Sequence, residues 1–382
     1  MSTLSLNNVI VHELIKKAKE PISSVEEDRF RFRDTELNCE NATVQRMINE
    51  INSLYGKSGN SAQYGIFKEE ETERGPVPDA IIRYIGSSSR TTQMFIDLSV
   101  EIMKKLGKEA EKQVLSSGGV IVFADYIRDG VHFFLITMIK QKEGIRLSAN
   151  MEPELLEQLE LSKINQAARI NFDRFFQYQN SPELDKHDLS YLSFIGGSSS
   201  SNASGYFITA LGCDKGVTAN RATKNLPKEV RAFFMKHPEL KDHAKKFKNE
   251  VLSYLAQQLH NKKPARLSDI RLLSLRYMAS LEDDKREKLS EDLVTHLNSE
   301  EVRIPNEFSV SASGLKSIMN IKVKGNGYSF DFEKSLLGTN NDADICYNKE
   351  GGSLTFTNLS DSAKQLIELA LNEKNEPASD DE

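Results

Sequence analysis

The chain has 382 residues, 38% of them apolar and 28% charged, which is enough for two or three domains with hydrophobic cores and a solvated surface. No apolar run reaches the roughly 18–20 residues of a membrane-spanning helix, and the first residues lack the pattern of a signal peptide. Cys39, Cys213 and Cys346 form no paired pattern, which is typical of a reducing compartment. We therefore expect a cytoplasmic protein.

Charge is distributed unevenly along the chain. Fifteen Lys/Arg stand against five Asp/Glu from Lys215 to Arg276, a net charge of +10. Because the whole chain carries −6, the remainder carries −16. Such asymmetry favours a nucleic-acid-binding segment inside an acidic protein, and the alternative is a solvated helical face.

Residues 1–190 predict an N-terminal α+β domain with a mainly antiparallel sheet. The segment VIVHELIKKA, which begins at Val9, suits either a strand leading into a helix or a helix alone. Helical spacing after an Asn41 or Thr43 cap predicts a helix that ends at Gly56, and a longer helix is expected from about Thr91 to Leu115.

The clearest strand signal is GGVIVFADYIRDGVHFFLITMIKQ. Two runs of β-branched and aromatic residues flank Arg128-Asp129-Gly130, where Asp-Gly favours a tight hairpin turn. A third predicted strand, INQAARINFDRFFQY, extends the same sheet. These strands account for the sheet of the N-terminal domain.

Residues 191–225 hold the serine-rich loop GGSSSSNASG and an aromatic segment on either side of it. A phosphate-binding loop requires G-x-x-x-x-G-K-[ST], but the spacing from Gly197 to Gly205 is wrong and Tyr206 replaces the lysine. The G-x-G-x-x-G fingerprint of dinucleotide sites is missing as well. We interpret this stretch as a flexible connection, and its contact with phosphate stays an open question.

Residues 226–300 predict a basic helical region in which Pro227 and Pro238 occupy first-turn positions. In its second helix, Lys241, Lys245 and Lys248 follow one flank of the apolar face.

Residues 301–372 predict a C-terminal β-rich region, with strands in FSVSAS, IKVKGNGYSFDFEKSLLG, ADICYN and SLTFTN and a closing helix. Residues 373–382 form an acidic tail with the composition of a disordered segment.

Catalytic and metal sites find little support in the sequence. His237 and His243 are six residues apart and do not share a helical face, and His12-Glu13 lacks the second histidine of a zinc helix. Ser313 and Lys316 match S-x-x-K without its companion motifs. We therefore expect no enzymatic activity, no metal and no cofactor.

The basic helical region is the candidate binding surface. Lys and Arg at helical spacing follow a phosphate backbone without reading bases, which gives affinity without sequence preference. The candidate DNA-binding residues are Lys215, Arg221, Lys224, Lys228, Arg231, Lys236, Lys241, Lys245, Lys246, Lys248, Lys262, Lys263 and Arg266.

Several separated segments, kept in order, resemble the bacterial nucleoid-associated protein family of the YejK/NdpA type. They are VHELIKK, YGIF at 64–67, SGGVIVFADY, YLSFI at 191–195, YFITALGC at 206–213 and FDFEKSLLG at 330–338. The resemblance implies a cytoplasmic, nucleoid-associated DNA-binding protein without a known reaction. It places Lys224 near a basic position of the family. The serine-rich loop departs from the family, whose members often carry basic residues there.

These observations favour a nucleoid-associated protein that binds duplex DNA largely without sequence specificity through its basic helical surface. The alternative is an adaptor whose acidic parts engage a DNA-processing partner, for example a topoisomerase or another nucleoid protein, or which acts in a mobile-element or phage-defence setting. The sequence does not decide whether RNA or DNA is preferred, or which groove or shape is recognised. The oligomeric state also stays open, with a homodimer as one option.

Overall fold

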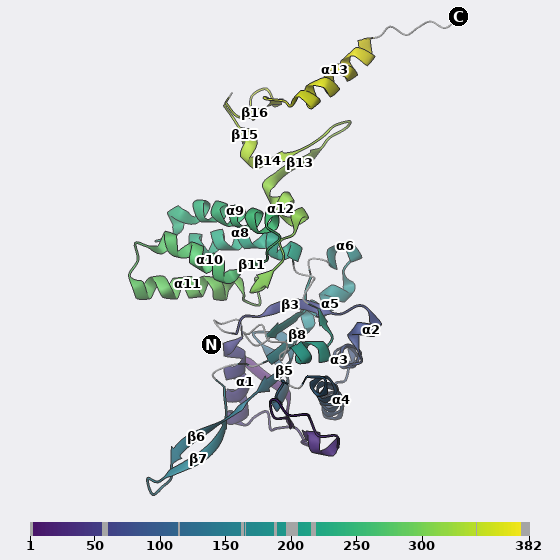
Figure 1. Cartoon of the computed structure of the whole chain (residues 1–382), viewed down its shortest axis with the longest axis vertical. Coiled ribbons are helices and arrows are strands. Elements are labelled where there is room, and N and C mark those ends of the chain that lie inside the picture. Colours follow the sequence, from purple (N-terminus) through teal and green to yellow (C-terminus); the bar gives the residue numbers. More distant parts are fainter. Residues whose placement is uncertain are drawn as a thin grey trace, which may run out of the picture. The chain divides into compact units, whose positions relative to one another are not determined.

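The computed structural model describes residues 3–55, 60–113, 115–161, 164, 166–186, 189–195, 205–214, 219–340 and 342–375. The chain divides into two compact units, Met1–Gly314 and Leu315–Glu382. The finer division of the first 300 residues stays a prediction. Figure 1 shows the elements of both units.

The centre of the first unit is a sheet in the order β10-β3-β9-β8-β5-β4-β1-β2, in which all paired neighbours within the described residues are antiparallel. Its strands are β1 (Leu4–Leu14), β2 (Phe30–Arg31), β3 (Gln63–Phe67), β4 (Gly119–Arg128), β5 (Val131–Ile139), β8 (Gln166–Asn171), β9 (Leu192–Ile195) and β10 (Cys213–Asp214). The predicted α+β class with a mainly antiparallel sheet is confirmed.

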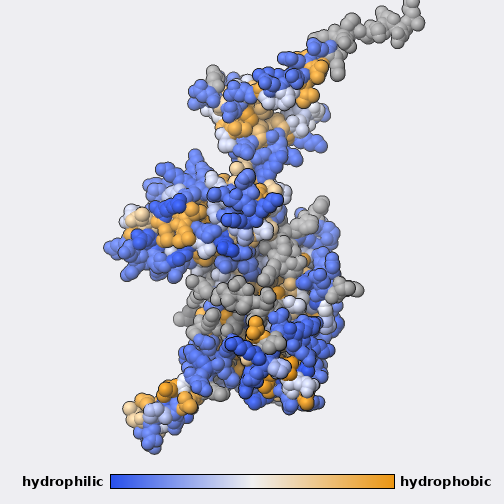
Figure 2. All heavy atoms as spheres, in the orientation of Figure 1, coloured by the Kyte–Doolittle hydropathy of each residue, from blue (hydrophilic) through white to orange (hydrophobic). Residues whose placement is uncertain are grey.

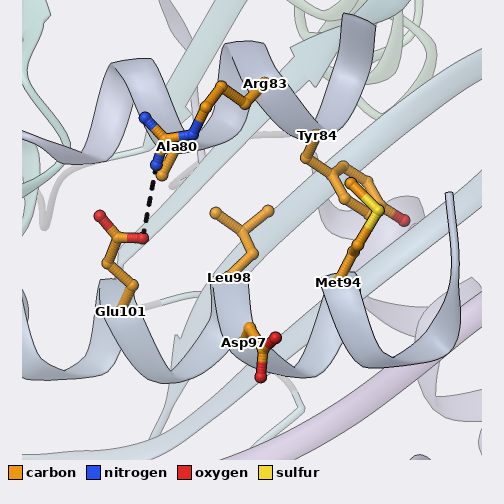
Figure 3. Close-up of a pocket in the computed structure, with 7 residues that line it drawn as sticks. All are labelled: Ala80, Arg83, Tyr84, Met94, Asp97, Leu98 and Glu101. Carbon is orange, nitrogen blue, oxygen red and sulfur yellow. Dashed lines mark ion pairs between the residues drawn. The ribbon is translucent and has the colours of Figure 1, made fainter. Parts of the chain in front are cut away.

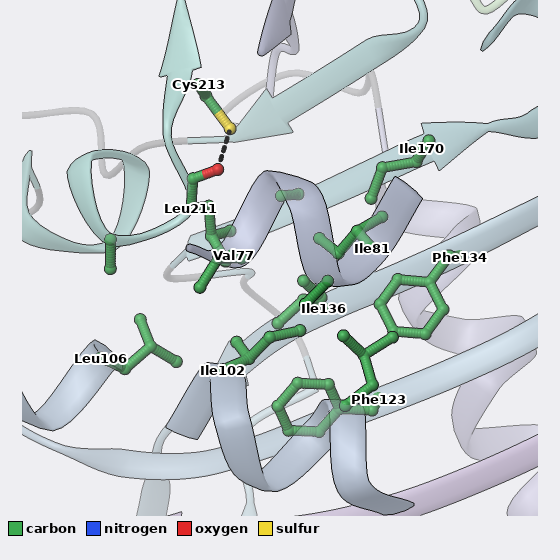
Figure 4. Packing of buried hydrophobic residues seen from close by; sticks show 14 of the residues in the cluster. Val77, Ile81, Ile102, Leu106, Phe123, Phe134, Ile136, Ile170, Leu211 and Cys213 are labelled. Carbon is green, nitrogen blue, oxygen red and sulfur yellow. Dashed lines mark hydrogen bonds between the residues drawn. The ribbon is translucent and has the colours of Figure 1, made fainter. Parts of the chain in front are cut away.

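Helices cover both faces of this sheet. Along β4, Ile121 and Phe123 pack on one face against α3 (Val77–Gly86) and α4 (Thr92–Glu111), as Figure 4 shows in part. The alternate residues of β4 pack on the other face against α1 (Ala42–Leu54). Strand side chains point to alternate faces, so a strand buried on both sides reads as a continuous apolar run.

Local signals placed several elements correctly. Asn41 caps α1 by accepting hydrogen bonds from the backbone N–H groups of Thr43 and Val44. In the turn between β4 and β5, Asp129 and Gly130 have φ of 51° and 81°, the left-handed conformation that Asp-Gly tolerates. The predicted cap and hairpin are both confirmed.

Two predictions near the sheet are wrong in part. The segment VIVHELIKK has no helix, because Val9 to Leu14 belong to β1 and pair with β4. The third predicted strand stops at Asn171, whose side chain accepts the N–H of Arg174 and starts α5 (Phe172–Asn180). An N-cap therefore ends the strand where aromatic composition alone favoured its continuation.

The helical region begins earlier than predicted. Its helices are α8 (Ala219–Lys236), α9 (Ala244–His260), α10 (Leu267–Leu275) and α11 (Asp283–Leu297), with the short turns η4 (Lys241–His243) and η5 (Arg276–Met278). Pro227 lies inside α8 rather than at its first turn, and Pro238 lies between α8 and η4. Pro227 is buried, and the packing of its side chain outweighs the loss of the helical hydrogen bond that a proline nitrogen cannot donate.

Short elements complete the first unit. Ala265–Arg266 (β11) pairs with Glu307–Phe308 (β12). Of the strand predicted in FSVSAS, only the first residue, Phe308, is therefore in a strand. Ser311 then accepts the N–H of Gly314 and starts α12 (Ala312–Met319). The others are η1 (Glu27–Arg29), α2 (Glu71–Arg74), α6 (Glu183–Lys186) and α7 (Gly205–Ala210).

A two-stranded ribbon of β6 (Gln141–Leu147) and β7 (Pro153–Leu159) extends from the first unit (Figure 1). Ile145 pairs with Leu155 across it, and both side chains stay more than three-quarters exposed. Apolar residues gather along the ribbon in Figure 2. The ribbon therefore lies outside the hydrophobic core.

The second unit contains small strands and a final helix, as predicted. Its elements are β13 (Asn320–Lys324), β14 (Ser329–Glu333), η6 (Lys334–Leu336), β15 (Leu337–Gly338), β16 (Ile345–Asn348), β17 (Ser353–Phe356) and α13 (Asp361–Asn375). Phe330 and Phe332 stack at 5.5 Å, and Phe332 meets Phe356 edge-on at 5.9 Å. These aromatic contacts join the hairpin β13–β14 to the sheet β15–β16–β17.

Candidate nucleic-acid interface

Helices α8 and α9 present most of the candidate basic residues. Their apolar faces meet where Phe234 stacks on Phe247 at 4.5 Å, and Leu226, Val230, Val251 and Leu255 are buried around this contact. Burying these faces fixes which residues of each helix point outward. The packing of the two helices therefore decides how the basic side chains are displayed.

A basic stripe, defined as Arg221, Lys224, Lys228 and Arg231, runs along the outer side of α8. At about 100° per residue these four positions fall within about 80° of each other, opposite the buried face of the helix. Arg221 and Lys224 are half-buried, whereas Lys228 and Arg231 are exposed. Their spacing of three, four and three residues was readable from the sequence, but the expected helix start at Pro227 concealed it.

The lysines of the second predicted helix fall into separate groups. Lys241 lies in η4, before α9 begins, while Lys245 and Lys248 lie about 60° apart on one flank of α9. Lys246 points about 100° further round the helix than Lys245. The expected flank is therefore formed by Lys245 and Lys248 within α9, with Lys241 contributed by the preceding turn.

The remaining candidates differ in their availability. Lys236 ends α8, and Lys262 and Lys263 are exposed in the turn after α9. Arg266 is paired with Glu307 at 2.7 Å. Lys215 and the serine-rich loop 196–204 lie outside the described residues.

Exposed cations without a carboxylate partner are the side chains best able to meet phosphate. Within the described part of the chain, no ion pair involves Lys228, Arg231, Lys236, Lys241, Lys245, Lys246, Lys248, Lys262 or Lys263. By contrast, Arg271 and Arg276 of the same region pair with Glu287 and Glu250. A cation already paired loses that partner when it binds phosphate, so these nine residues are the better candidates.

A second basic cluster, which sequence reasoning missed, connects β8 and α5 to the residues that follow α11. Glu300 accepts hydrogen bonds from Arg169 at 2.7 Å and from Arg303 at 3.0 Å, and Arg174 lies 3.7 Å away. Burial acts to raise the pKa of Glu300, but the three arginines outweigh it and hold that pKa below its ordinary value. We call these four residues the arginine cluster.

His12 shows how a histidine in a buried setting is satisfied without catalysis. Its Nε2 lies 2.8 Å from the hydroxyl of Ser99, which itself donates to the carbonyl of Ile96, and its Nδ1 accepts the N–H of Arg33. Burial lowers the pKa of His12 to about 4. The ring is therefore neutral, with its proton on Nε2.

One surface pocket lies between α3 and α4 (Figure 3). Its polar lining consists of Arg83, Tyr84, Asp97 and Glu101, and Arg83 lies 3.8 Å from Glu101. Two carboxylates against one arginine disfavour a phosphate ligand. We therefore do not include this pocket in the candidate interface.

The described residues form neither a metal-binding group nor a membrane-spanning helix. Within these residues, no three or more His, Cys, Asp or Glu side chains are grouped so as to hold a metal ion. None of the described helices is both long enough and apolar enough to cross a bilayer.

Comparison with known proteins identifies the family. The family described as Nucleoid-associated protein YejK matches residues 10–364. A nucleoid-associated protein of Metapseudomonas resinovorans is 26% identical over 356 residues, which cover 93% of this chain and 97% of the relative. Relatives in Pseudomonas fluorescens (strain Pf0-1) and Azotobacter vinelandii are 26% and 24% identical, over 95% of this chain and 99% and 98% of their own lengths. The chain therefore belongs to the YejK family of nucleoid-associated proteins.

Proposed function

We propose that this protein binds duplex DNA, largely without sequence specificity, through the basic residues of α8, η4, α9 and the turn that follows. The observation that carries the proposal is the set of nine lysines and arginines without carboxylate partners within the described residues, of which all but the half-buried Lys248 are exposed. Their outward position lets them meet a phosphate backbone, and a contact of this kind carries no base information.

The family and the names of its members support the same function. The relatives in Metapseudomonas and Pseudomonas are named nucleoid-associated proteins, so we place this chain at the nucleoid, in the cytoplasm. Our proposal assigns it a binding role without catalysis. A two-fold homodimer would present the basic surface twice, which sedimentation velocity can test.

The test measures binding to a fluorescent duplex of mixed sequence between 50 and 300 mM salt. We expect log K to fall with log salt by roughly 0.9 for each phosphate contact. The variant Lys241→Glu/Lys245→Glu/Lys248→Glu should lose both affinity and slope. The matched control, Lys108→Glu/Lys140→Glu/Lys142→Glu, reverses three exposed lysines outside the basic region and should bind like the wild type. A wild-type affinity that does not change with salt would contradict the proposal.

A second candidate function is the recruitment of a DNA-processing protein such as a topoisomerase. Helix α13 favours it, because Leu366, Ile367, Leu369 and Leu371 are all about half exposed or more. Amphipathic helices of this kind bind in apolar grooves of other proteins. Pull-down from nuclease-treated lysate with the wild type and with Leu366→Ser/Ile367→Ser separates this function from DNA binding. A protein that binds α13 directly is retained by the wild type without DNA and is lost in the variant.

A further inference from the structure

The arginine cluster carries more positive charge than its single carboxylate can neutralise. The Glu300 carboxylate meets Arg169 at 2.7 Å, Arg303 at 3.0 Å and Arg174 at 3.7 Å. Its remaining hydrogen bond comes from the neutral amide of Asn171, at 3.1 Å. Three guanidinium groups and one carboxylate leave an excess of two positive charges.

Two of the three arginines are deeply buried. Arg303 stacks on Tyr64, and Arg169 lies against the rings of Tyr55 and Phe133, at 4.2 and 4.7 Å. The Nε atoms of both arginines are buried and have no hydrogen-bond partner among the described residues. Buried charges in proteins are usually paired, and an unpaired excess favours the binding of an anion.

Among the described residues, the members of the cluster that reach solvent most are Arg174 and Glu300. The side chains of Arg174 and Glu300 are each about a quarter exposed, at 24% and 25%. Arg174 also donates through Nη2 to the backbone carbonyl of Glu300 at 3.3 Å, which holds its guanidinium at this exposed part of the cluster. An anion from solvent therefore meets Arg174 first.

Arg221 of α8 is the nearest basic residue outside the cluster to act on Arg174. Burial lowers the pKa of the Arg174 guanidinium, Glu300 opposes that effect, and nearby Arg221 lowers the pKa further. The positive charge of Arg221, the first residue of the stripe, therefore acts on the guanidinium of Arg174.

We propose that Arg174, supported by Arg169 and Arg303 and beside Arg221, binds a phosphate group. A guanidinium presents paired N–H donors that match the oxygens of phosphate, and the buried excess charge behind it strengthens the attraction. The proposal rests on the proposed function, because it takes the phosphate from DNA. The source is either an internal phosphodiester or a terminal phosphate of the strand.

The first experiment needs no DNA. Thermal unfolding of the full chain is followed in inorganic phosphate and in chloride at equal ionic strength. We expect phosphate to raise the melting temperature of the wild type more than that of Arg174→Gln, with Arg174→Lys between the two. Phosphate also stabilises proteins generally, so Arg83→Gln, which removes a surface arginine elsewhere, should respond like the wild type. An equal response of all four proteins would overturn the proposal.

The second experiment compares the wild type with Arg174→Gln on three duplexes: one closed by hairpins, one with 5′-hydroxyl ends and one with 5′-phosphate ends. Loss of one phosphate contact should lower the slope of log K against log salt by about 0.9. A lower slope for Arg174→Gln on all three duplexes would show that Arg174 contacts an internal phosphodiester. A lower slope only on the duplex with 5′-phosphate ends would show that it contacts a terminal phosphate. Unchanged slopes on every duplex would overturn the assignment of the phosphate to DNA.

The two experiments separate this inference from the proposed function. If the phosphate-specific stabilisation depends on Arg174 but the wild type binds no duplex, the anion site stands and the proposed function fails. If the duplex binds with a steep salt dependence but Arg174→Gln behaves as the wild type in both experiments, the proposed function stands and the inference fails. A circular dichroism spectrum confirms that each variant is folded before it is compared.

Discussion

The guanidinium of Arg303 lies over the ring of Tyr64, 4.6 Å from its centroid, and the Tyr64 hydroxyl donates to the carbonyl of Asn298 at 2.7 Å. Asn298 itself exchanges hydrogen bonds with the backbone of Ala62, at 2.7 and 2.8 Å. These contacts join the end of α11 to strand β3. The basic helices are therefore held on the sheet by a buried polar network rather than by apolar packing alone.

Removing the carboxylate of this network should destabilise the first unit strongly. Glu300→Gln leaves three arginines without a counter-charge, and breaking a buried ion pair in this way costs about 3–5 kcal/mol. Urea unfolding measures the loss. The neighbouring Glu301 is exposed, so Glu301→Gln should change the free energy of unfolding by no more than about 0.5 kcal/mol. Equal effects of the two substitutions would contradict this account of the cluster.

Stability should fall below neutral pH because of His12. Its folded-state pKa of about 4 lies under the ordinary value of 6.5, so between these values only the unfolded chain takes up the proton. The contribution is complete above pH 6.5 and is lost as the pH falls towards 4. We expect a loss of about 2 kcal/mol between pH 7 and pH 5.

The control for this prediction is His12→Gln, which cannot titrate but can still donate a hydrogen bond to Ser99. Urea unfolding at pH 7 and pH 5 should show a smaller decrease for the variant than for the wild type. The same decrease in both proteins would mean that folding does not lower the pKa of His12.

The basic stripe of α8 should contribute to DNA binding at least as much as the flank of α9. Lys228→Glu/Arg231→Glu should lower the slope of log K against log salt by about 1.8, the loss of two phosphate contacts. The same measurement is made on Lys245→Glu/Lys248→Glu and on Lys262→Glu/Lys263→Glu. Comparing the losses of slope shows which of the three groups contacts DNA. A stripe variant that binds as the wild type would restrict the interface to α9 and the turn after it.

The β6–β7 ribbon should be dispensable for folding. Ile145 and Leu155 face each other across the ribbon but are 76% and 77% exposed, so Ile145→Ser/Leu155→Ser removes no core contact. The free energy of unfolding should change by less than about 1 kcal/mol. Leu135→Ser, in the buried part of β5, provides the contrast and should cost several times more. A large loss in the ribbon variant would show that the ribbon is packed in solution.

Local patterns in the sequence predicted the α+β class, the hairpin at Asp129-Gly130, the capped helix α1 and the long helix α4. Each depends on residues close together in the chain. The strand β1 was ambiguous because the spacing of Val9 to Leu14 suits a helix as well, and its partner β4 follows more than a hundred residues later. The pairing of this segment with β4, rather than its local sequence preference, makes it a strand.

The candidate interface was predicted in composition but not in geometry. Charge counting found the basic residues, yet it could not separate paired Arg266 from unpaired Lys262, because the partner Glu307 is distant in sequence. The arginine cluster combines Arg169 with Glu300, 131 residues apart, so no local pattern contains it. The stripe of α8 was local and could have been found, had Pro227 not suggested a later helix start.

The pairing of β1 with β4 has a consequence for synthesis on the ribosome. Leu4–Leu14 leaves the ribosome before its hydrogen-bond partners on one side, which are residues 119–128. The edge of β1 that faces β4 stays unpaired until more than a hundred further residues have been made, and β3 waits for β9 at 192–195 and for Asn298. Such long-range pairing makes folding slow and leaves strand edges exposed in the nascent chain. The sheet of the first unit can therefore close only after β9 and β10 have been synthesised.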